Sequence, residues 1–536
     1  MDYTSTRLPY GPSGYFTKII VDYVEGNDKL SPFYEHKVSV EGLAAAIMAR
    51  EKFPTDRALL VNELRDQYKG VETSEKVLNN IEALLGDDTF SIVTAHQPVI
   101  FTGTLYFIYK ILHTVKLAEA CRIQFPGRNF VPVFYMGSED ADLEELGKIY
   151  MGIEKITWDT RQKGAVGRMN TKGLEKIITR IEGEISGLPH GNELIALFRD
   201  CYLNSPDVQT ATFKLINTLF QDFGVVVLVP DRAALKQAMH KIFEDDLFNR
   251  TPSSVVEKSV EELGAVYKVQ ANPREINLFY LKDQIRELFI QDGGNYRVKN
   301  TELVFTEAGL RAELEDHPER FSPNVILRGL FQETILPDIA FIGGGGETAY
   351  WLELKALFNH YNTPFPVLVL RNSFLLITQK WVEKLNSLGI SETEIFKEPR
   401  ILINEIVEKR SGKQLTLEHE IEELKSFYAH ISVVSSDVDV SLLRHVDALK
   451  SRALKNIEEL EKKILKAEKR KFEDQNRQVS QVKEALFPKN GLQERVDNFI
   501  TWYAKYGKSF FDLLYENSLT TEQEFVVLTE KAPTDA

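Results

Sequence analysis

The sequence predicts an α/β protein whose parallel-sheet core is followed by a C-terminal helical arm. Two segments, 91–110 and 338–360, each contain a short apolar run that stops at polar or glycine residues and continues as an amphipathic helix. A third apolar run, FVPVFYM at 130–136, follows the first of these helices and completes a β-α-β unit, whose strands are nearly always parallel. After about residue 385 the apolar residues repeat every three or four positions instead.

The segment 91–110, SIVTAHQPVIFTGTLYFIYK, is interpreted as the first ligand-binding edge of the sheet. An apolar strand over 91–95 runs into a polar His-Gln-Pro sequence, and a helix follows the Gly103 turn. Open α/β sheets bind ligands at the carboxyl ends of their strands. Tyr106 and Lys110 lie one helical turn apart and can face the crevice together, with a solvated lysine as an equal alternative. The candidate substrate-binding residues here are Gln97, Gly103, Tyr106 and Lys110.

The segment 338–360 repeats this layout, with a strand over 338–342, four glycines and a helix that opens at Glu347. The glycines lack the ending of a P-loop and do not fit the dinucleotide-binding fingerprint, but they let a ligand approach the backbone. A carboxylate at the helix start would repel phosphate. We therefore interpret Glu347 as a catalytic partner of an amine or of hydroxyls, with helix capping as the alternative. Further candidate substrate-binding residues are Gly344, Gly345 and Tyr350, although Tyr350 and Trp351 fit core positions better.

Acidic residues follow the strand at 130–136 directly, in the segment Ser138-Glu139-Asp140-Ala141-Asp142-Leu143. Carboxylates at this edge could hold an ammonium group, bind sugar hydroxyls or hold magnesium. The alternative is capping of a helix that begins at LEEL, where the helix dipole favours acidic side chains. We predict that Glu139 and Asp140 are catalytic and that Asp142 binds substrate.

The remaining elements of the core follow from hydrophobic periodicity. The short β-like runs at about 250–305 predict an α+β segment inserted in the parallel sheet. The predicted helices cover 40–50, 58–68 and about 172–222, buried parallel strands are expected at 224–231 and 366–370, and short strands and turns at 148–170.

The C-terminal part of the chain predicts a helical coiled-coil arm. Alternating charges flank the second of two apolar series, and a break at 435–440 favours a helical hairpin over a long rod. A helical cap packed on its own core is the alternative. The predicted division is a core over 1–385, the arm and C-terminal helices over 386–518, and a tail over 519–536. The two series are Leu417, Ile421, Leu424, Tyr428 and Ile431, then Ala453, Ile457, Leu460, Ile464 and Ala467.

Composition excludes several classes of protein. The chain has 536 residues and a formal net charge of −14, so nonspecific binding to nucleic acid or to an anionic membrane is not expected. The sequence contains no long apolar run and no basic leader followed by an apolar stretch, which predicts a soluble cytoplasmic protein. The only two cysteines, Cys121 and Cys201, lack the spacing of a zinc site or a disulfide framework and are interpreted as buried structural thiols.

Five segments together resemble the BshC family of cysteine-adding enzymes of bacillithiol biosynthesis. They are TSTRLPYGPSGYF, AHQPVIFTGTLYFIYK, PVFYMGSEDADLEEL, FSPNVILRGLFQETILPDIAFIGGGGETAYW and NGLQER. The likeness covers essentially the whole chain in the family's order. The sequence departs from the family pattern at Ala141, where histidine is common, and at His96, where glutamine is frequent. An imidazole at either position is therefore not expected to be the essential base.

The resemblance implies a Rossmann-like parallel sheet core with inserted connecting segments and a coiled-coil domain that supports a homodimer. The implied activity joins L-cysteine to the glucosamine amine of malyl-glucosamine, the final step of bacillithiol synthesis. The resemblance also implies binding of ATP or ADP. A role for Mg²⁺ stays open, and no metal-ligating residues are predicted.

With this acceptor, Arg328 and Arg371 become the cationic candidates, because a guanidinium group pairs with a carboxylate through two hydrogen bonds. Asn324 and Gln332 lie in the same segment as Arg328 and are further candidate substrate-binding residues. The alternatives are a solvent-exposed Arg328 and an interdomain ion pair for Arg371.

Amide formation requires a carboxyl group that carries a leaving group, a neutral amine, and donors that stabilise the developing negative charge. Two other functions stay open. One is a nucleotidylyltransferase or other adenylate-forming enzyme acting on another small acid, although the HxGH signature of that superfamily is absent after 91–95. The other is a noncatalytic, nucleotide-binding dimeric scaffold.

Overall fold

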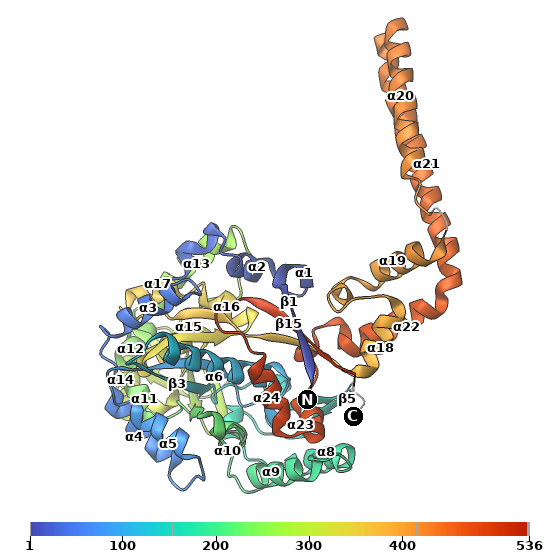
Figure 1. Ribbon diagram of the computed structural model, residues 1–536. Coiled ribbons are helices and arrows are strands. Elements are labelled where there is room, and N and C mark those ends of the chain that lie inside the picture. The colour runs from blue at the N-terminus through green and yellow to red at the C-terminus, as the bar shows by residue number, and fades with distance from the viewer. Residues whose placement is uncertain (1, 153, 413–414, 533–536) are drawn as a thin grey trace. The chain divides into compact units, whose positions relative to one another are not determined.

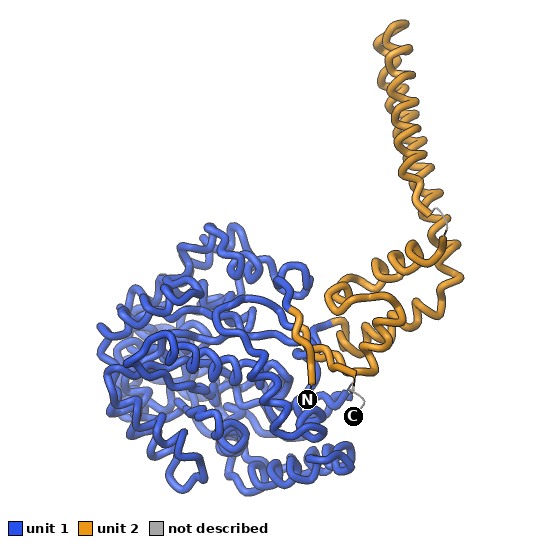
Figure 2. The backbone as a smooth tube through the Cα atoms, in the orientation of Figure 1, with its two compact units in different colours: residues 1, 7–375, 491–526 blue, residues 2–6, 376–490, 527–536 orange. Residues whose placement is uncertain are grey.

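The computed structural model describes residues 2–152, 154–412 and 415–532 (Figure 1). These residues form two compact units (Figure 2). Unit 1 contains 7–375 and 491–526, whereas unit 2 contains 2–6, 376–490 and 527–532.

A five-stranded parallel sheet forms the centre of unit 1, in the strand order β13-β12-β2-β3-β6. Every neighbouring pair is parallel, and β2 pairs with β3 without a break from Thr89 opposite Asn129 to His96 opposite Met136. The predicted Rossmann-like parallel sheet is therefore confirmed. The strands are β2 (Thr89–His96), β3 (Asn129–Met136), β6 (Val226–Leu228), β12 (Asp338–Gly343) and β13 (Val367–Leu370).

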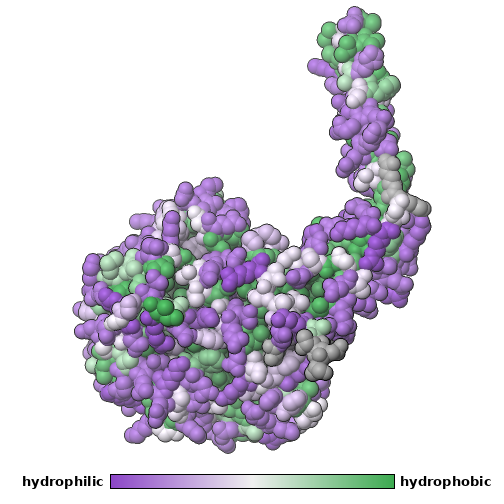
Figure 3. Space-filling model, in the orientation of Figure 1, coloured by the Kyte–Doolittle hydropathy of each residue, from purple (hydrophilic) through white to green (hydrophobic). Residues whose placement is uncertain are grey.

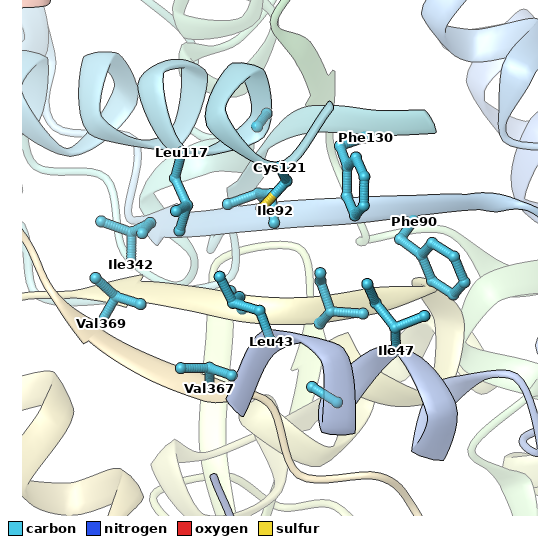
Figure 4. Close-up of a cluster of buried hydrophobic side chains, with 14 residues drawn as sticks. Leu43, Ile47, Phe90, Ile92, Leu117, Cys121, Phe130, Ile342, Val367 and Val369 are labelled. Atoms are coloured by element: carbon cyan, nitrogen blue, oxygen red, sulfur yellow. The ribbon is translucent and has the colours of Figure 1, made fainter. Parts of the chain in front are cut away.

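Helices cover both faces of this sheet, as the apolar strands require. In Figure 4, α6 (Tyr106–Gln124) lies on one face and α3 (Val40–Arg50) on the other. Leu117 and Cys121 of α6 and Leu43 of α3 belong to the buried cluster that also contains Ile92 of β2. Cys121 is thus a core residue, and Cys201 is also fully buried, as predicted for structural thiols.

A second, antiparallel sheet follows helix α13 (Thr251–Gly264) and has the order β10-β9-β8-β7-β11. It corresponds to the inserted α+β segment, but it extends beyond the predicted end at 305, because β11 returns to pair with β7. Its strands are β7 (Leu278–Lys282), β8 (Ile285–Asp292), β9 (Asn295–Val298), β10 (Val304–Thr306) and β11 (Phe321–Pro323).

The other elements of unit 1 surround these two sheets. β4 (Lys148–Met151) and β5 (Glu154–Thr157) form an antiparallel pair. The further α-helices are α1 (Tyr10–Ser13), α2 (Lys18–Val24), α4 (Arg57–Tyr68), α5 (Glu75–Ala83), α7 (Leu143–Leu146), α8 (Leu174–Ile185), α9 (Gly191–Leu203), α10 (Val208–Phe220), α11 (Ala233–Gln237), α12 (His240–Phe248), α14 (Glu307–Asp316), α15 (Val325–Ile335), α16 (Gly345–Trp351), α17 (Lys355–His360), α23 (Phe499–Tyr506) and α24 (Lys508–Glu516).

The predicted division of the chain stays a prediction. In the structure, helices α23 and α24, which it groups with the arm, pack within unit 1. Aromatic packing is the reason: Phe511 of α24 stacks on Phe220 of α10 with ring centroids 5.2 Å apart, and Phe499 of α23 meets the ring of Phe198 of α9 edge-on. The expected tail at 519–536 contains strand β15 (Glu524–Glu530), in a sheet of order β1-β15-β14 with β1 (Tyr3–Pro9) and β14 (Ser373–Ile377).

Unit 2 contains the predicted helical hairpin, formed by α20 (Glu418–Val438) and α21 (Leu443–Lys469). α20 continues three residues beyond the start of the expected break, and the turn lies at 439–442. At its base, Ile464 packs against a cluster of Ile403, Val407 and Leu415. The other helices of unit 2 are α18 (Gln379–Leu388), α19 (Pro399–Ser411) and α22 (Glu473–Leu486).

Many apolar side chains of the hairpin are exposed, and α20 has no buried residue. Figure 3 shows apolar residues gathered over the free end of the hairpin. The exposed large apolar residues are Phe427, Val433, Val434, Val438, Val440, Leu442, Leu449 and Leu460. Within the described part of the chain, none of the helices is both long and apolar enough to span a membrane.

Candidate functional site

A cavity of about 760 Å³, called here the main cavity, opens at the carboxyl ends of the parallel strands. Residues directly after β2, β3, β12 and β13 line it, which is where ligands bind in open α/β sheets. Ten of the sequence-predicted residues line this cavity: Gln97, Tyr106, Asp140, Asn324, Arg328, Gly344, Gly345, Glu347, Tyr350 and Arg371.

Glu347 and Lys110 form an ion pair at the wall of the main cavity. The ammonium group of Lys110 donates to Oε2 of Glu347 at 2.6 Å and also to the carbonyl of Ala95. The same Oε2 accepts the backbone N–H of Gly344 at 2.8 Å, so Glu347 caps the start of α16 while its side chain lines the cavity. Lys110 itself is 1% exposed and lies behind Glu347, which makes the alternative of a solvated lysine wrong.

Arg371 forms a buried ion pair of its own. Its NH2 group lies 2.7 Å from Oε1 of Glu494, and its NH1 group donates to the carbonyl of Asn372 at 3.0 Å. The guanidinium group lies over the ring of Tyr106, and Nε has no hydrogen-bond partner among the described residues. A Cβ at Gly344 would lie 3.5 Å from this Nε, so the glycine keeps the space beside Arg371 open.

Arg328 and Asp140 face each other across the main cavity wall, with NH1 and Oδ2 3.6 Å apart. Gln97 donates to the same Oδ2 at 3.3 Å. Burial alone would raise the pKa of Asp140, but the charges of Arg328 and Arg286 outweigh it and lower that pKa below its usual value. Asp140 is therefore ionised at neutral pH, and the exposed alternative for Arg328 does not hold, because only 24% of its side chain is exposed.

Three further arginines line the main cavity that the sequence did not single out: Arg274, Arg286 and Arg495. Arg286 lies with its guanidinium group 4.0 Å from the ring centre of Phe279, and burial together with the charge of Arg328 lowers its pKa to about 10. Arg286 sits in β8 of the inserted segment, where no local pattern marks it. Arg495 is the last residue of the NGLQER motif, which contributes to the family resemblance but contains none of the predicted site residues.

Glu139 points away from the main cavity, unlike its neighbour Asp140. It is 6% exposed and paired with the ammonium group of Lys236, which is fully buried. The same ammonium group binds Asp231 at 2.8 Å, and Asp231 in turn accepts two hydrogen bonds from Arg168. Glu139 therefore belongs to a buried ionic network, and its placement does not favour the catalytic role predicted for it.

Gln332 and Asn324 also have structural partners. Gln332 is 2% exposed, lies outside the main cavity and donates to Glu333, which is paired with the buried Arg50. Asn324 lines the cavity, but its side-chain oxygen caps α15 by accepting the N–H of Ile326 at 2.9 Å. Neither amide is positioned as a free recognition group, so their predicted substrate-binding roles rest on the sequence alone.

His96 and Tyr106 form a polar contact at the edge of the main cavity. Nε2 of His96 lies 3.2 Å from the Tyr106 hydroxyl, and Nδ1 lies 3.0 Å from the carbonyl of Gln97. The carbonyl can only accept, so Nδ1 carries the proton and Nε2 accepts from the tyrosine. Burial and the charge of Lys110 lower the pKa of His96 to about 4, so the ring is neutral at neutral pH.

A second cavity of about 380 Å³, called here the side cavity, adjoins the main one. His96, Tyr106, Glu145 and Arg495 line both cavities. The two remaining predicted residues, Gly103 and Asp142, line the side cavity. Asp142 caps the short helix α7, because its Oδ1 accepts the N–H of Glu145 at 2.9 Å. Among the described residues no group of His, Cys, Asp and Glu side chains is arranged to hold a metal ion.

Comparison with known proteins covers both halves of the chain. The family model for the N-terminal Rossmann-like domain of the bacillithiol biosynthesis protein BshC matches residues 1–372, and the model for its C-terminal coiled-coil domain matches residues 374–530. A protein of Flavobacterium johnsoniae named "Putative cysteine ligase BshC" is 38% identical over 97% of this chain and 99% of its own length. Proteins with the same name from Christiangramia forsetii and Cytophaga hutchinsonii are 37% and 38% identical, over 97% and 91% of this chain and 98% and 92% of theirs.

Proposed function

The chain belongs to the BshC family of bacillithiol biosynthesis, and from this premise we propose that it is a ligase that joins L-cysteine to the glucosamine amine of malyl-glucosamine, the final step of the pathway. The observation that carries the proposal is the composition of the main cavity. Five arginines and the carboxylates of Asp140 and Glu347 line a single cavity at the carboxyl ends of the sheet. A ligand that carries both carboxylate groups and an amine fits such a lining.

The malyl group supplies the anionic end of this acceptor. Arg328, Arg286 and Arg371 line the main cavity, and Nε of Arg371 has no partner among the described residues. A guanidinium group binds a carboxylate through two parallel hydrogen bonds, which fixes its orientation as well as its charge. We place the malyl carboxylates against these arginines.

The glucosamine amine must lose a proton before or during its attack on the cysteine carbonyl carbon. Glu347 has one oxygen, Oε2, engaged by Lys110 and Gly344, whereas its other oxygen has no recorded partner in the described structure. A carboxylate held in this way can accept the amine proton as a general base. Asp140, ionised beside Arg328, is the second candidate for holding the amine.

The cysteine carboxyl needs a leaving group, and ATP is the proposed source. In the first step the carboxylate displaces pyrophosphate or ADP and becomes an acyl adenylate or acyl phosphate. In the second step the amine forms the C–N bond, the C–O bond breaks, AMP or phosphate leaves, and the amine proton passes to the base. Mg²⁺ would enter with the phosphates, because magnesium is usually bound through substrate phosphates and few protein carboxylates.

The test is a reconstitution of the reaction with purified protein. L-cysteine carrying an isotope label, malyl-glucosamine, ATP and Mg²⁺ should give labelled bacillithiol by mass spectrometry, together with AMP or ADP in equal amount. A deletion strain should accumulate malyl-glucosamine and lack bacillithiol, and the gene should restore it. An unchanged thiol pool in the deletion strain would remove the ligase proposal. An adenylylated product formed without cysteine would favour the nucleotidylyltransferase alternative.

We also propose that the protein is a homodimer held in part by the hairpin α20–α21. Leu460 is 49% exposed and Phe427 is 58% exposed, although both belong to apolar positions of the hairpin. Contiguous exposed apolar surface on a soluble helix pair is normally covered by a partner. A cytoplasmic location is proposed as well, because two unpaired buried thiols suit a reducing compartment.

A further inference from the structure

The side cavity has a lining unlike that of the main cavity. Its own walls include the apolar side chains of Val99, Leu146 and Ile149, each less than 7% exposed. Charged residues line it as well: Asp142, Glu144 and Lys148 line the side cavity alone, and Glu145 and Arg495 line both cavities. Apolar side chains together with both signs of charge match a small zwitterion with an apolar side chain.

We propose that the side cavity is the subsite for the free amino acid, with the ammonium group at Glu145, the carboxylate at Arg495 and the –CH₂–SH group among the apolar residues. The assignment rests on the proposed ligase function and adds to it the place of the second substrate. The main cavity then holds the anionic acceptor.

The two charged residues at the boundary lack a counter-charge in direct contact. Within the described ranges, neither Glu145 nor Arg495 forms a salt bridge, although the guanidinium group of Arg495 lies over the ring of Phe16, 5.8 Å from its centroid. Glu145 lies near the like charges of Asp142 and Asp140, and burial together with these charges raises its pKa. Burial and the charge of Arg371 lower the pKa of Arg495. An ammonium group bound beside Glu145 would balance its negative charge. A carboxylate bound beside Arg495 would balance its positive charge.

A residue of the side cavity also has an unpaired polar group. Thr102 lines the cavity and is 1% exposed, and its buried hydroxyl has no hydrogen-bond partner in the described structure. Phe101 and Thr102 both have positive φ, 50° and 64°, which is unfavourable for residues other than glycine. Strained backbone and unpaired buried polar groups concentrate at ligand sites, where the ligand supplies the missing interactions.

The position of Arg495 determines where the carboxyl carbon of the bound amino acid would lie. Because Arg495 lines both cavities, a carboxylate bound to it lies at their boundary. The acceptor amine approaches that boundary from the main cavity, where Glu347 is available to take its proton. The thiol points away from the reaction and lies among Val99, Leu146 and Ile149, which keeps the more reactive nucleophile of cysteine apart from the activated carboxyl group.

Calorimetry with the full chain tests the assignment. L-cysteine under reducing conditions should bind the wild type, whereas cysteamine, which lacks the carboxylate, and 3-mercaptopropionate, which lacks the ammonium group, should each bind about 10-fold or more weakly. Glu145→Gln and Arg495→Gln should lose cysteine affinity by a similar factor. Glu262→Gln, which changes an exposed carboxylate on α13, is the matched control and should bind as the wild type does.

A variant that fills only the side cavity separates the two subsites. Ile149→Phe should abolish cysteine binding and leave malyl-glucosamine binding within about twofold, because Ile149 does not line the main cavity. If a folded Ile149→Phe protein bound cysteine with the same affinity as the wild type, the assignment would be overturned. So would the absence of cysteine binding to the wild type in the presence of acceptor and nucleotide.

Disulfide trapping gives an answer even if Ile149→Phe does not fold. In Val99→Cys the new thiol would lie beside a bound amino acid, and exchange with cystine would leave one cysteinyl group on the protein and release one cysteine. Excess L-serine, which shares the zwitterion, should slow this labelling at Val99→Cys and not at Val325→Cys in the main cavity. Labelling of Val99→Cys that serine does not slow would refute the subsite. Failure of the ligase proposal would appear separately, as lack of bacillithiol in the reconstituted reaction.

Discussion

Lys110 and Glu347, 237 residues apart in the chain, meet through a hydrogen bond of 2.6 Å between Nζ and Oε2. The contact joins the two sequence segments in which a strand gives way to a helix, one after β2 and one after β12. It gives Glu347 a fixed orientation at the cavity wall, while Lys110 is 1% exposed and cannot reach a ligand itself. Lys110 is therefore a positioning residue for Glu347.

This pair should behave as a unit when it is mutated. Glu347→Gln leaves a buried ammonium group without its counter-charge and should lower the unfolding free energy by about 3 kcal/mol or more. Adding Lys110→Met should restore most of the stability but not ligation, because the proton acceptor stays absent and a general base contributes about 10²–10⁴-fold. Denaturant titration and product formation measure the two effects. Recovery of activity in the double variant would contradict the role of Glu347 as base.

Glu139→Gln and Asp140→Asn should differ, although the two residues are neighbours. Glu139 is paired with buried Lys236, so its replacement should cost about 3 kcal/mol of stability. Asp140 lines the main cavity, and its replacement should impair ligation with little change in melting temperature. Thermal melts and product assays on both variants test this contrast. The reverse pattern would mean that Glu139 faces the substrate.

Arg328→Lys keeps the positive charge but loses the planar two-point contact. Affinity for malyl-glucosamine should fall by about 1–3 kcal/mol in calorimetry. Arg161→Lys, at an exposed position outside both cavities, serves as the matched control and should bind with unchanged affinity. If Arg328→Lys also binds normally, then the malyl carboxylates lie elsewhere.

The hairpin offers positions that separate dimer formation from folding of the arm. Phe427→Glu with Leu460→Glu places charge on exposed apolar positions and should dissociate the dimer while helicity is kept. Ile464→Glu should instead unfold the base of the arm, because Ile464 packs on the cluster of Ile403, Val407 and Leu415. Light scattering and circular dichroism distinguish the two results. A monomeric wild type at micromolar concentration would refute the dimer.

Stability should depend on pH through His113, which is fully buried. Its Nδ1 accepts the N–H of Asn372 at 3.1 Å, and Nε2 lies 2.9 Å from the carbonyl of Thr520. Burial lowers the pKa of His113 to about 4 from an ordinary 6.5.

Between pH 6.5 and 4 the unfolded state therefore binds more protons than the folded state, and the unfolding free energy falls as the pH falls. The shift corresponds to about 3 kcal/mol at most. His113→Gln should flatten this part of the curve in urea titrations at several pH values. The lowered pKa of His96 makes the unfolding free energy depend on pH in the same direction. The contribution of His113 is therefore the difference between the slopes of the wild type and of His113→Gln. An unchanged slope in the variant would contradict the prediction.

Local patterns were sufficient to predict the strands at the centre of the sheet and the residues that follow them. β2, β3 and β12 lie within two residues of the expected positions, and Asp140, Glu347 and Arg371 all line the main cavity. Each of these depends on neighbours in sequence: an apolar run and the first polar side chains beyond it.

Side-chain direction and distant partners could not be predicted in this way. Glu139 and Asp140 are adjacent, yet one pairs with Lys236 and the other faces the cavity, because both lie in the turn that follows the end of β3 at Met136. Arg286 reaches the cavity only because the inserted sheet folds against it. The side cavity has no sequence signature, since it forms where α7, the Gly103 turn and the NGLQER motif meet.

The ion pair between Arg371 and Glu494 also sets an order of events during synthesis. The two residues are 123 positions apart, and all of 376–490 is made between them. At about 5–20 residues per second, a ribosome needs roughly 6–25 s to advance from one to the other. During that interval the nascent core has a buried arginine without its counter-charge and lacks α23 and α24. Unit 1 thus reaches its native form only after residues 491–526 have been made, although most of its residues are made before the arm.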